Sequence, residues 1–226
     1  LCTPLQAMSL GMEYAKKCNA DLLLATDPDC DRVGIAVKNP QGEYVLLSGN
    51  ETGLLLLDYI CSQRVKHQKM PADPVMVKTI VTMDLSERIA EHYGLRTINV
   101  LTGFKFIGEQ IGMLEQQGKA DSYVLGFEES YGCLAGTYAR DKDAVVATLL
   151  ICEMAAYYKK QGMTLYDGLM ALYEKYGYYK DAVKSIGLSG IEGLAKIQSI
   201  MEHFRNNTPE GFGEYKVLSA RDYKND

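Results

Sequence analysis

The segment Leu22-Leu23-Leu24-Ala25-Thr26-Asp27-Pro28-Asp29-Cys30-Asp31-Arg32 joins an apolar run directly to a row of carboxylates. The continuous apolar run predicts a strand that is buried on both faces of a sheet. Because residues two apart in an extended segment point the same way, we expect Asp27, Asp29 and Asp31 to converge after this strand. Open α/β sheets place their ligands at this carboxyl end, so the segment indicates both a fold class and a site.

Three neighbouring carboxylates repel one another unless a cation compensates their charge. Mg²⁺ is the natural partner for such oxygen ligands, so Asp27, Asp29 and Asp31 are predicted to bind it. Arg32 adds a planar donor fork that suits a phosphate beside the metal. An EF-hand fits less well, because it requires Gly where Arg32 stands and Glu where Lys38 stands. The alternatives are the DxD motif of a nucleotide-sugar glycosyltransferase, a two-aspartate phosphatase motif and a solvated acidic turn.

Strand and helix patterns alternate along most of the chain, which predicts parallel βαβ units in a layered α/β domain. Hydrophobic periodicity and turn residues predict strands at 22–25, 33–37, 44–47, 75–81, 97–101 and 122–126. The same patterns predict helices at 3–19, 51–65, 86–93, 106–117, 144–160 and 165–176. The remaining segment carries one amphipathic helix, 194–204, and a short strand, 215–218, which together suggest a connector.

Composition and charge exclude several classes of protein. Of the 226 residues 47% are apolar, and 24 Lys and Arg against 29 Asp and Glu give a net charge of -5. Without a basic cluster the chain is not expected to bind nucleic acid. No apolar stretch reaches the ~18 residues of a membrane helix. Because the chain opens at Leu1 without an initiator Met or a signal segment, we expect a piece of a longer protein.

The cysteine pattern indicates the cellular compartment in which we expect the protein. Six cysteines are scattered without a CxxC pair, so neither a zinc site nor a disulfide scaffold is indicated. Most are predicted to be small buried hydrophobes in a reducing compartment, and the expected location is the cytoplasm.

Three further loops carry chemistry at predicted strand-to-helix junctions. Gly126-Phe127-Glu128-Glu129-Ser130-Tyr131-Gly132 offers carboxylates and a hydroxyl that suit the vicinal hydroxyls of a sugar, although acidic loops between glycines are common. Leu101-Thr102-Gly103-Phe104-Lys105 starts a helix, whose free N–H groups favour an anion. In Arg140-Asp141-Lys142-Asp143 the two cations are candidates to face a phosphate, and Asp143 is expected to cap the next helix.

In this order the four loops resemble those of the α-D-phosphohexomutase superfamily, specifically its phosphoglucomutase and phosphomannomutase branch. The family's enzymes have four domains, and the resemblance covers nearly the whole chain. It implies that residues 1–47 are the C-terminal part of domain 2 and that 48–177 are domain 3. Residues 178–226 would then connect to domain 4. The expected fold is a three-layer α/β/α domain with a mixed, mostly parallel sheet, together with part of a second similar domain.

The resemblance also implies roles for individual residues. Asp27, Asp29 and Asp31 would bind Mg²⁺, and Arg32 would contact the phosphoryl group. The substrate-binding residues would be those of the three later loops: Thr102, Gly103, Lys105, Glu128, Ser130 and Lys142. Of these, Glu128 and Ser130 would read sugar hydroxyls, and Thr102 and Lys142 would line the substrate cleft. The implied partners are a hexose phosphate and the remaining domains of the same parent chain, with no nucleic acid and no membrane.

Two motifs of the family have no match in this sequence. One is the phosphoserine loop of Ser-His-Asn-Pro type, and the other is the phosphate-binding loop of Arg-x-Ser-Gly-Thr-Glu type. The resemblance implies a parent isomerase that interconverts glucose 1-phosphate and glucose 6-phosphate through a phosphoserine and glucose 1,6-bisphosphate. The present chain is expected to be inactive alone. Phosphomannomutase or phosphopentomutase activity in the parent is an alternative, as is a non-catalytic sugar-phosphate-binding module. The sequence leaves the oligomeric state open.

Overall fold

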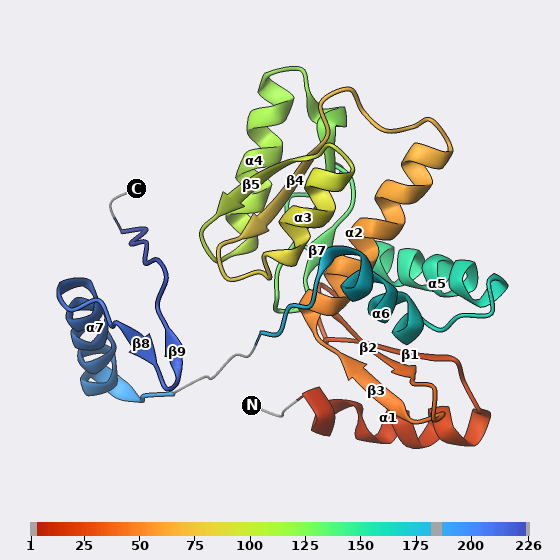
Figure 1. Cartoon of the computed structure of the whole chain (residues 1–226), viewed down its shortest axis with the longest axis horizontal. Coiled ribbons are helices and arrows are strands. Elements are labelled where there is room, and N and C mark those ends of the chain that lie inside the picture. The colour runs from red at the N-terminus through yellow and green to blue at the C-terminus, as the bar shows by residue number, and fades with distance from the viewer. Residues whose placement is uncertain (1–3, 182–186, 225–226) are drawn as a thin grey trace. The chain divides into compact units, whose positions relative to one another are not determined.

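A computed structural model describes residues 4–181 and 187–224, which form two compact units. The larger unit is Leu1–Lys180 and the smaller is Asp181–Asp226 (Figure 1). The larger unit contains a three-stranded sheet, a four-stranded sheet and six of the α-helices. All four loops singled out in the sequence therefore belong to one unit.

The three-stranded sheet is antiparallel throughout. Its order is β1 (Leu22–Thr26), β2 (Val33–Lys38) and β3 (Tyr44–Leu47), with Ala25 opposite Gly34. Helix α1 (Pro4–Cys18) contacts β1 from one side, and α5 (Ala144–Lys160) contacts β1 and β2. The prediction that the first strand is buried on both faces is wrong, since its side chains are half-buried or exposed. Within the described residues β1 pairs with β2 alone, so it lies at the edge of the sheet.

The four-stranded sheet confirms the predicted parallel βαβ units. Strands β5 (Arg96–Val100), β4 (Val75–Thr79) and β6 (Tyr123–Phe127) are parallel neighbours in that order. The two-residue strand β7 (Cys133–Leu134) pairs antiparallel with β6 and was not predicted, because so short a segment has no periodicity. The sheet is therefore mixed and mostly parallel, as expected.

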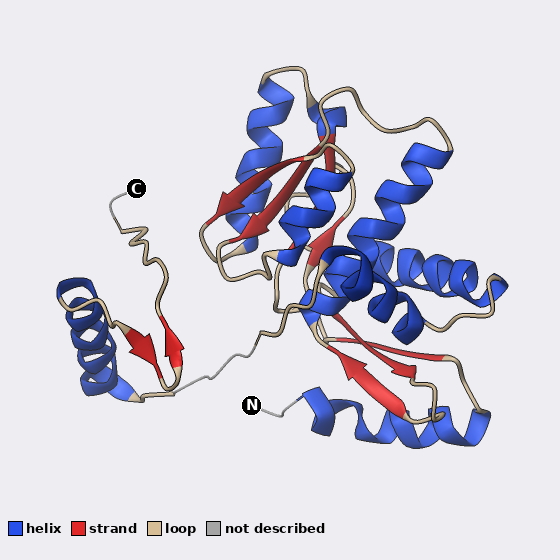
Figure 2. Ribbon diagram, viewed as in Figure 1, coloured by secondary structure: helices blue, strands red, loops and turns tan. Residues whose placement is uncertain are grey.

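Helices cover both faces of this sheet and give three layers (Figure 2). One face, with Val75 and Val77, packs against α4 (Phe104–Gln116) through Ile107 and Ile111. On the other face, Met76 belongs to the core built by the remaining helices. These are α2 (Gly49–Lys66), α3 (Leu85–His92), α5 and α6 (Leu165–Tyr176), and a 3-10 turn, Ala120–Ser122, precedes β6. Alternate residues of a strand face opposite sides, so β4 needs apolar residues at nearly every position.

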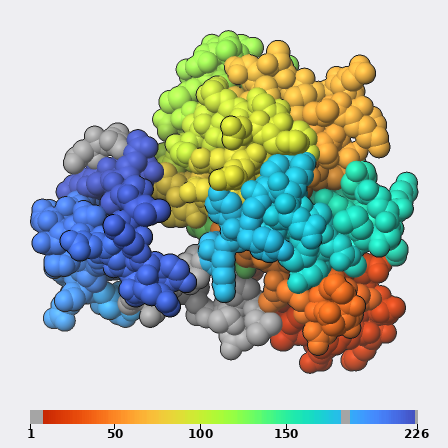
Figure 3. Space-filling model, in the orientation of Figure 1, coloured from red at the N-terminus to blue at the C-terminus, as the bar shows by residue number. Residues whose placement is uncertain are grey.

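Helix α6 joins the two sheets of the larger unit. It contacts α2, α3, α5 and β2, and its side chains fill the surface between α3 and α5 in Figure 3. The Asp58 carboxylate of α2 accepts hydrogen bonds from the hydroxyls of Tyr93 (3.0 Å) and Tyr176 (2.9 Å). Ile35 and Leu47 of the three-stranded sheet lie in the same hydrophobic core as these helices. The three-stranded sheet therefore contributes to the same hydrophobic core as these helices.

The smaller unit is a helix followed by a hairpin. Helix α7 (Gly190–Asn206) includes the predicted 194–204, and β8 (Gly211–Phe212) pairs antiparallel with β9 (Tyr215–Lys216). The predicted strand 215–218 is thus shorter than expected.

The prediction that most cysteines are buried is wrong. Of the five that the structure describes, Cys61 and Cys133 are buried, Cys30 is half-buried, and Cys18 and Cys152 are exposed; all five thiols are free. Cys2 lies outside the described residues. Cys152 follows the fully buried Ile151 in α5, and the next residue of a helix points about 100° away from its neighbour. No helix among the described residues combines the length and apolarity that crossing a membrane requires.

Candidate metal and phosphate site

The loop after β1 brings the three predicted aspartates together. One carboxylate oxygen from each of Asp27, Asp29 and Asp31 lies within 4.8 Å of the other two. The segment is a tight turn and not the extended chain assumed from the sequence, with Cys30 at φ 57°. Asp27 holds this turn, because its Oδ1 accepts the N–H groups of Asp31 (3.1 Å) and Arg32 (3.0 Å). The predicted convergence is therefore present, but a side-chain-to-backbone turn produces it.

Two cations partly balance these carboxylates. Arg32 Nη1 lies 3.6 Å from Asp27 Oδ2 and 3.9 Å from Asp31 Oδ1, and Lys142 Nζ lies 2.8 Å from Asp31 Oδ2. Burial acts to raise the pKa of Asp27, but the N–H groups it accepts and the Arg32 charge hold that pKa below its ordinary value. Asp31 Oδ1 is buried and accepts no hydrogen bond. Three clustered carboxylates, one of them with a buried oxygen that accepts no hydrogen bond, fit a hard divalent cation.

Glu128 anchors the second predicted loop, which follows β6. Its side chain is only 5% exposed, and its Oε1 accepts the N–H of Gly103 at 3.1 Å. This bond joins the 126–132 loop to the loop that begins α4. Burial raises the pKa of Glu128, and the neighbouring Glu129 charge acts in the same direction. Ser130 is half-buried in the same loop.

Backbone hydrogen bonds tie the metal loop to the loop of Glu128. The N–H of Val33 donates to the carbonyl of Tyr131 (3.3 Å), and Arg32 forms an antiparallel bridge with Gly132. The N–H of Ala144, the first residue of α5, donates to the carbonyl of Cys30 at 3.2 Å. The metal loop, about 100 residues away in the sequence, is therefore fixed relative to the loop of Glu128 and to the start of α5.

The remaining predicted residues lie around these loops. Asp143 caps α5 as expected, since its carboxylate accepts the N–H groups of Val145 and Val146. Thr102 is exposed, Gly103 is the N-cap of α4 at φ 125°, and Lys105 is exposed with its ammonium over the Phe106 ring. Arg140 bonds to the Glu115 carboxylate and to the carbonyls of Thr137 and Ala139. Its guanidinium is therefore engaged by protein groups, unlike the expectation that it faces a phosphate.

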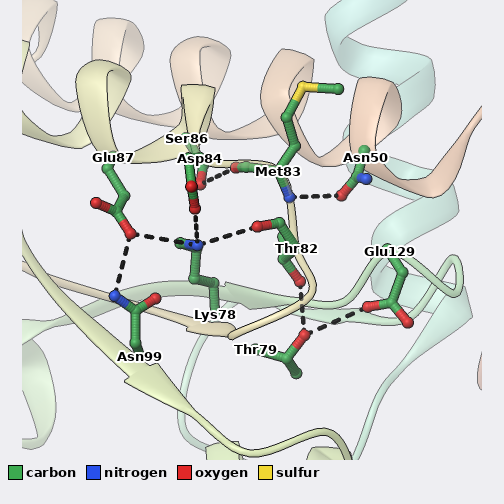
Figure 4. A network of polar contacts seen from close by, with 10 residues as sticks. All are labelled: Asn50, Lys78, Thr79, Thr82, Met83, Asp84, Ser86, Glu87, Asn99 and Glu129. Atoms are coloured by element: carbon green, nitrogen blue, oxygen red, sulfur yellow. Dashed lines mark hydrogen bonds and ion pairs between the residues drawn. The ribbon is translucent and has the colours of Figure 1, made fainter. Parts of the chain in front are cut away.

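A buried lysine beside this site was not predicted. Lys78 of β4 is 1% exposed, and its Nζ contacts the carbonyl of Thr82 (3.0 Å), Asp84 (2.8 Å) and Glu87 (3.2 Å) (Figure 4). A single Lys inside the otherwise apolar run Val75-Met76-Val77-Lys78 was the available signal, because a buried cation requires partners.

The lysine network continues into the loop of Glu128 (Figure 4). Thr79 and Thr82 share a hydrogen bond of 2.8 Å between their hydroxyls, and Thr79 also donates to Glu129 Oε2 at 3.3 Å. Asn50 Oδ1 accepts the N–H of Met83 at 3.1 Å, which fixes the same turn to the start of α2. The turn between β4 and α3 thus supports Glu129, the neighbour of Glu128.

The fold and the candidate site together indicate the class of protein. This is an α/β protein whose candidate loops follow the carboxyl ends of strands, and one of these loops brings three aspartates together. Family models for phosphoglucomutase/phosphomannomutase match in two places: α/β/α domain III at residues 48–176 and α/β/α domain II at residues 3–42. The chain belongs to the phosphoglucomutase/phosphomannomutase family.

Curated relatives agree with this assignment, and solved structures share the fold. A phosphoglucomutase of Staphylococcus aureus (strain N315) is 39% identical over 218 residues, which are 96% of this chain and 38% of that protein. The chain thus spans about two-fifths of the length of the curated relatives it matches. A putative phosphomannomutase of Thermus thermophilus has a TM-score of 0.58 at 22% identity, covering 75% of this chain and 34% of the other. The parafusin phosphoglucomutase of Paramecium has a TM-score of 0.59 at 18% identity, covering 82% and 29%. These two show the fold.

The raised pKa of Glu128 predicts a pH dependence of stability. A carboxyl that binds its proton more tightly in the folded state stabilises the fold at low pH. This contribution is lost as the pH rises from the ordinary glutamate pKa through the raised one. We expect Glu128→Gln to remove that loss, as measured by urea denaturation at intervals from about pH 4 to 7. The exposed Glu174→Gln should retain the wild-type profile, and an unchanged profile in Glu128→Gln would contradict the assignment.

Proposed function

We propose that this chain forms the metal-binding and sugar-reading side of the cleft of a phosphoglucomutase, which interconverts glucose 1-phosphate and glucose 6-phosphate. The observation that carries the proposal is the fixed placement of the Asp27, Asp29 and Asp31 loop beside the loop of Glu128. Membership of the family and the Staphylococcus aureus relative support it. Because the chain spans part of such relatives, the remaining groups of the cleft would come from other domains of the parent.

Each loop would have a separate task in this reaction. Asp27, Asp29 and Asp31 would hold Mg²⁺, which supplies positive charge where a phosphoryl group is transferred. Arg32, 45% exposed beside them, would bind the phosphoryl oxygens. On the sugar side, Glu128 and Ser130 would accept and donate hydrogen bonds to vicinal hydroxyls.

The loop that begins α4 would bind the end of the substrate away from the metal. The free N–H groups at a helix start favour an anion, and the exposed Lys105 adds charge there. Thr102 and Gly103 would line the same part of the cleft, with Gly103 held by Glu128. Hydrogen bonds from two side chains to sugar hydroxyls would also suit a mannose phosphate. Phosphomannomutase activity is therefore the nearest alternative. We place the parent in the cytoplasm, because scattered thiols without CxxC pairs suit a reducing compartment.

Calorimetric titration of glucose 1,6-bisphosphate into the chain tests this proposal. We expect binding in the presence of Mg²⁺, and weaker binding by at least about tenfold when the metal is removed with a chelator. Glu128→Gln should weaken the metal-dependent binding, because the amide replaces one acceptor oxygen by a donor. The matched control is Glu174→Gln on the exposed side of α6, which should bind as the wild type does.

Two results would contradict the proposal. The first is equal affinity with and without Mg²⁺, and the second is a Glu128→Gln chain that binds as tightly as Glu174→Gln. A parallel titration with mannose 1,6-bisphosphate separates the two sugars, since tighter binding of the mannose compound would favour the phosphomannomutase alternative.

A further inference from the structure

The Lys142 side chain reaches the metal loop and is in contact with three other segments of the chain. The lysine lies just before α5, its side chain is 10% exposed, and its Nζ contacts Asp31 Oδ2 at 2.8 Å and Asp141 Oδ1 at 2.9 Å. A Cβ added at Gly132 would lie 2.2 Å from Lys142 Cδ, so the lysine stem crosses this loop closely and a side chain at Gly132 would displace it. The ammonium also lies 5.7 Å from the centre of the Phe104 ring. The contact with Asp31 is thus built into the packing of the loops.

The Lys142 ammonium pairs with Asp31, one of the three carboxylates assigned to the metal. One oxygen of Asp31 pairs with Lys142, and the other is buried without a hydrogen bond. Burial opposes charge on Lys142, but its bonds to Asp31 and Asp141 raise its pKa above the ordinary value. A lysine ammonium and a divalent cation on the same carboxylate repel each other strongly at such short range. Each cation would therefore weaken the binding of the other to Asp31, even though they would use different oxygens.

We propose that Lys142 is a resident counter-cation of the metal loop that metal binding displaces into the cleft. In the metal-free chain the ammonium neutralises Asp31 and keeps the carboxylate cluster from repelling itself apart. Once a divalent cation neutralises Asp31, the ammonium is released and gains a free position for the phosphate of the substrate. Metal and phosphate binding are then coupled, and each increases the affinity for the other. The inference rests on the metal site of the proposed function and adds to it the regulation of that site.

The first test measures the affinity of the chain for Mn²⁺ alone, used as the probe for the divalent site. Removing the competing ammonium in Lys142→Met should tighten Mn²⁺ binding by about tenfold, less at high salt. Lys119→Met is the matched control, because the exposed Lys119 pairs with Asp73 and not with an aspartate of the metal loop. It should leave Mn²⁺ affinity unchanged, which separates a direct contact from a general loss of positive charge.

The second test follows Lys142 in the wild-type chain and needs no variant. Acetic anhydride modifies accessible lysines, and mass spectrometry gives the rate for each residue. Saturating Mn²⁺ should raise the rate at Lys142 severalfold and leave the rate at Lys119 unchanged. A rate at Lys142 that stays constant or falls would overturn the displacement.

The outcomes distinguish a failure of the proposed metal site from a failure of the counter-cation role of Lys142. If neither the wild-type nor the Lys142→Met chain binds Mn²⁺, the metal site of the proposed function is wrong. If the wild type binds and Lys142→Met binds equally or more weakly, the metal site stands and the counter-cation role is overturned. Binding by Lys142→Met alone would support the role, because the ammonium would then exclude the metal.

Discussion

Asp29→Asn is expected to weaken the binding of Mn²⁺ to this chain by at least about 100-fold, because the site loses one of three negative ligands. Asp29 is the best of the three positions for this test. Asp27 accepts two backbone N–H groups and Asp31 pairs with Lys142, so substitution there also disturbs the loop. In the described part of the chain no hydrogen bond or ion pair holds the exposed Asp29 carboxylate. The measurement is calorimetric titration of Mn²⁺ into the wild-type and variant chains.

The same variant should be at least as stable as the wild type without metal. Removing one of three clustered charges relieves repulsion, so the urea midpoint should stay the same or rise slightly. Asp73→Asn is the matched control: its carboxylate forms an exposed pair with Lys119 at 3.3 Å, a kind of contact that contributes little. It should bind Mn²⁺ as the wild type does. An Asp29→Asn chain that binds Mn²⁺ normally would refute the three-aspartate site.

Gly49→Ala is expected to destabilise the chain by about 3 kcal/mol, a large effect for adding one methyl group. Gly49 begins α2, directly after the Ser48 cap, and packs against the backbone of the loop that carries Glu128. A Cβ there would lie 2.2 Å from the carbonyl oxygen of Glu129 and 2.6 Å from the nitrogen of Tyr131. These are backbone atoms, so either the helix or the loop must move. Urea denaturation measures the loss, and calorimetry should show weaker glucose 1,6-bisphosphate binding as well.

Gly112→Ala provides the control for this substitution. Gly112 lies within α4, and a Cβ there would meet no atom within 4 Å. Alanine favours a helix by about 0.5–1 kcal/mol over glycine, so this variant should be more stable than the wild type. If Gly49→Ala behaved like Gly112→Ala, the close approach of α2 to the loop would be wrong.

The helices and strands of the larger unit were predictable where the hydrophobic periodicity of the sequence is strong. The helix bounds 144–160 and 165–176 agree with α5 and α6, and the strands of the parallel sheet differ by one or two residues. Prediction failed for β7 and for the burial of β1. A two-residue strand has no period, and the exposure of β1 depends on how many strands flank it.

The candidate site divides in the same way. The sequence indicated which side chains are candidates for the chemistry, and the structure brings the three aspartates together, although the assumed extended conformation was wrong. Lys78 and its partners were missed, because the pattern of an apolar strand does not show that a cation inside it finds Asp84 and Glu87. The turn of Asp27 around Arg32 was equally hidden, since it depends on hydrogen bonds from two backbone N–H groups.

The sequence by itself determined the layered α/β class and the four loops, because these follow from residue type and local spacing, and the resemblance of the four loops indicated the family. Only the tertiary structure decided which loops meet. It placed Glu128 against Gly103, Arg32 beside Gly132 and Lys142 on Asp31. These partners are separated by 25 to more than 100 positions, and only strand pairing and a shared core bring them into contact. Local sequence patterns do not show which distant residues meet, because the packing free energy that fixes these contacts belongs to the whole unit.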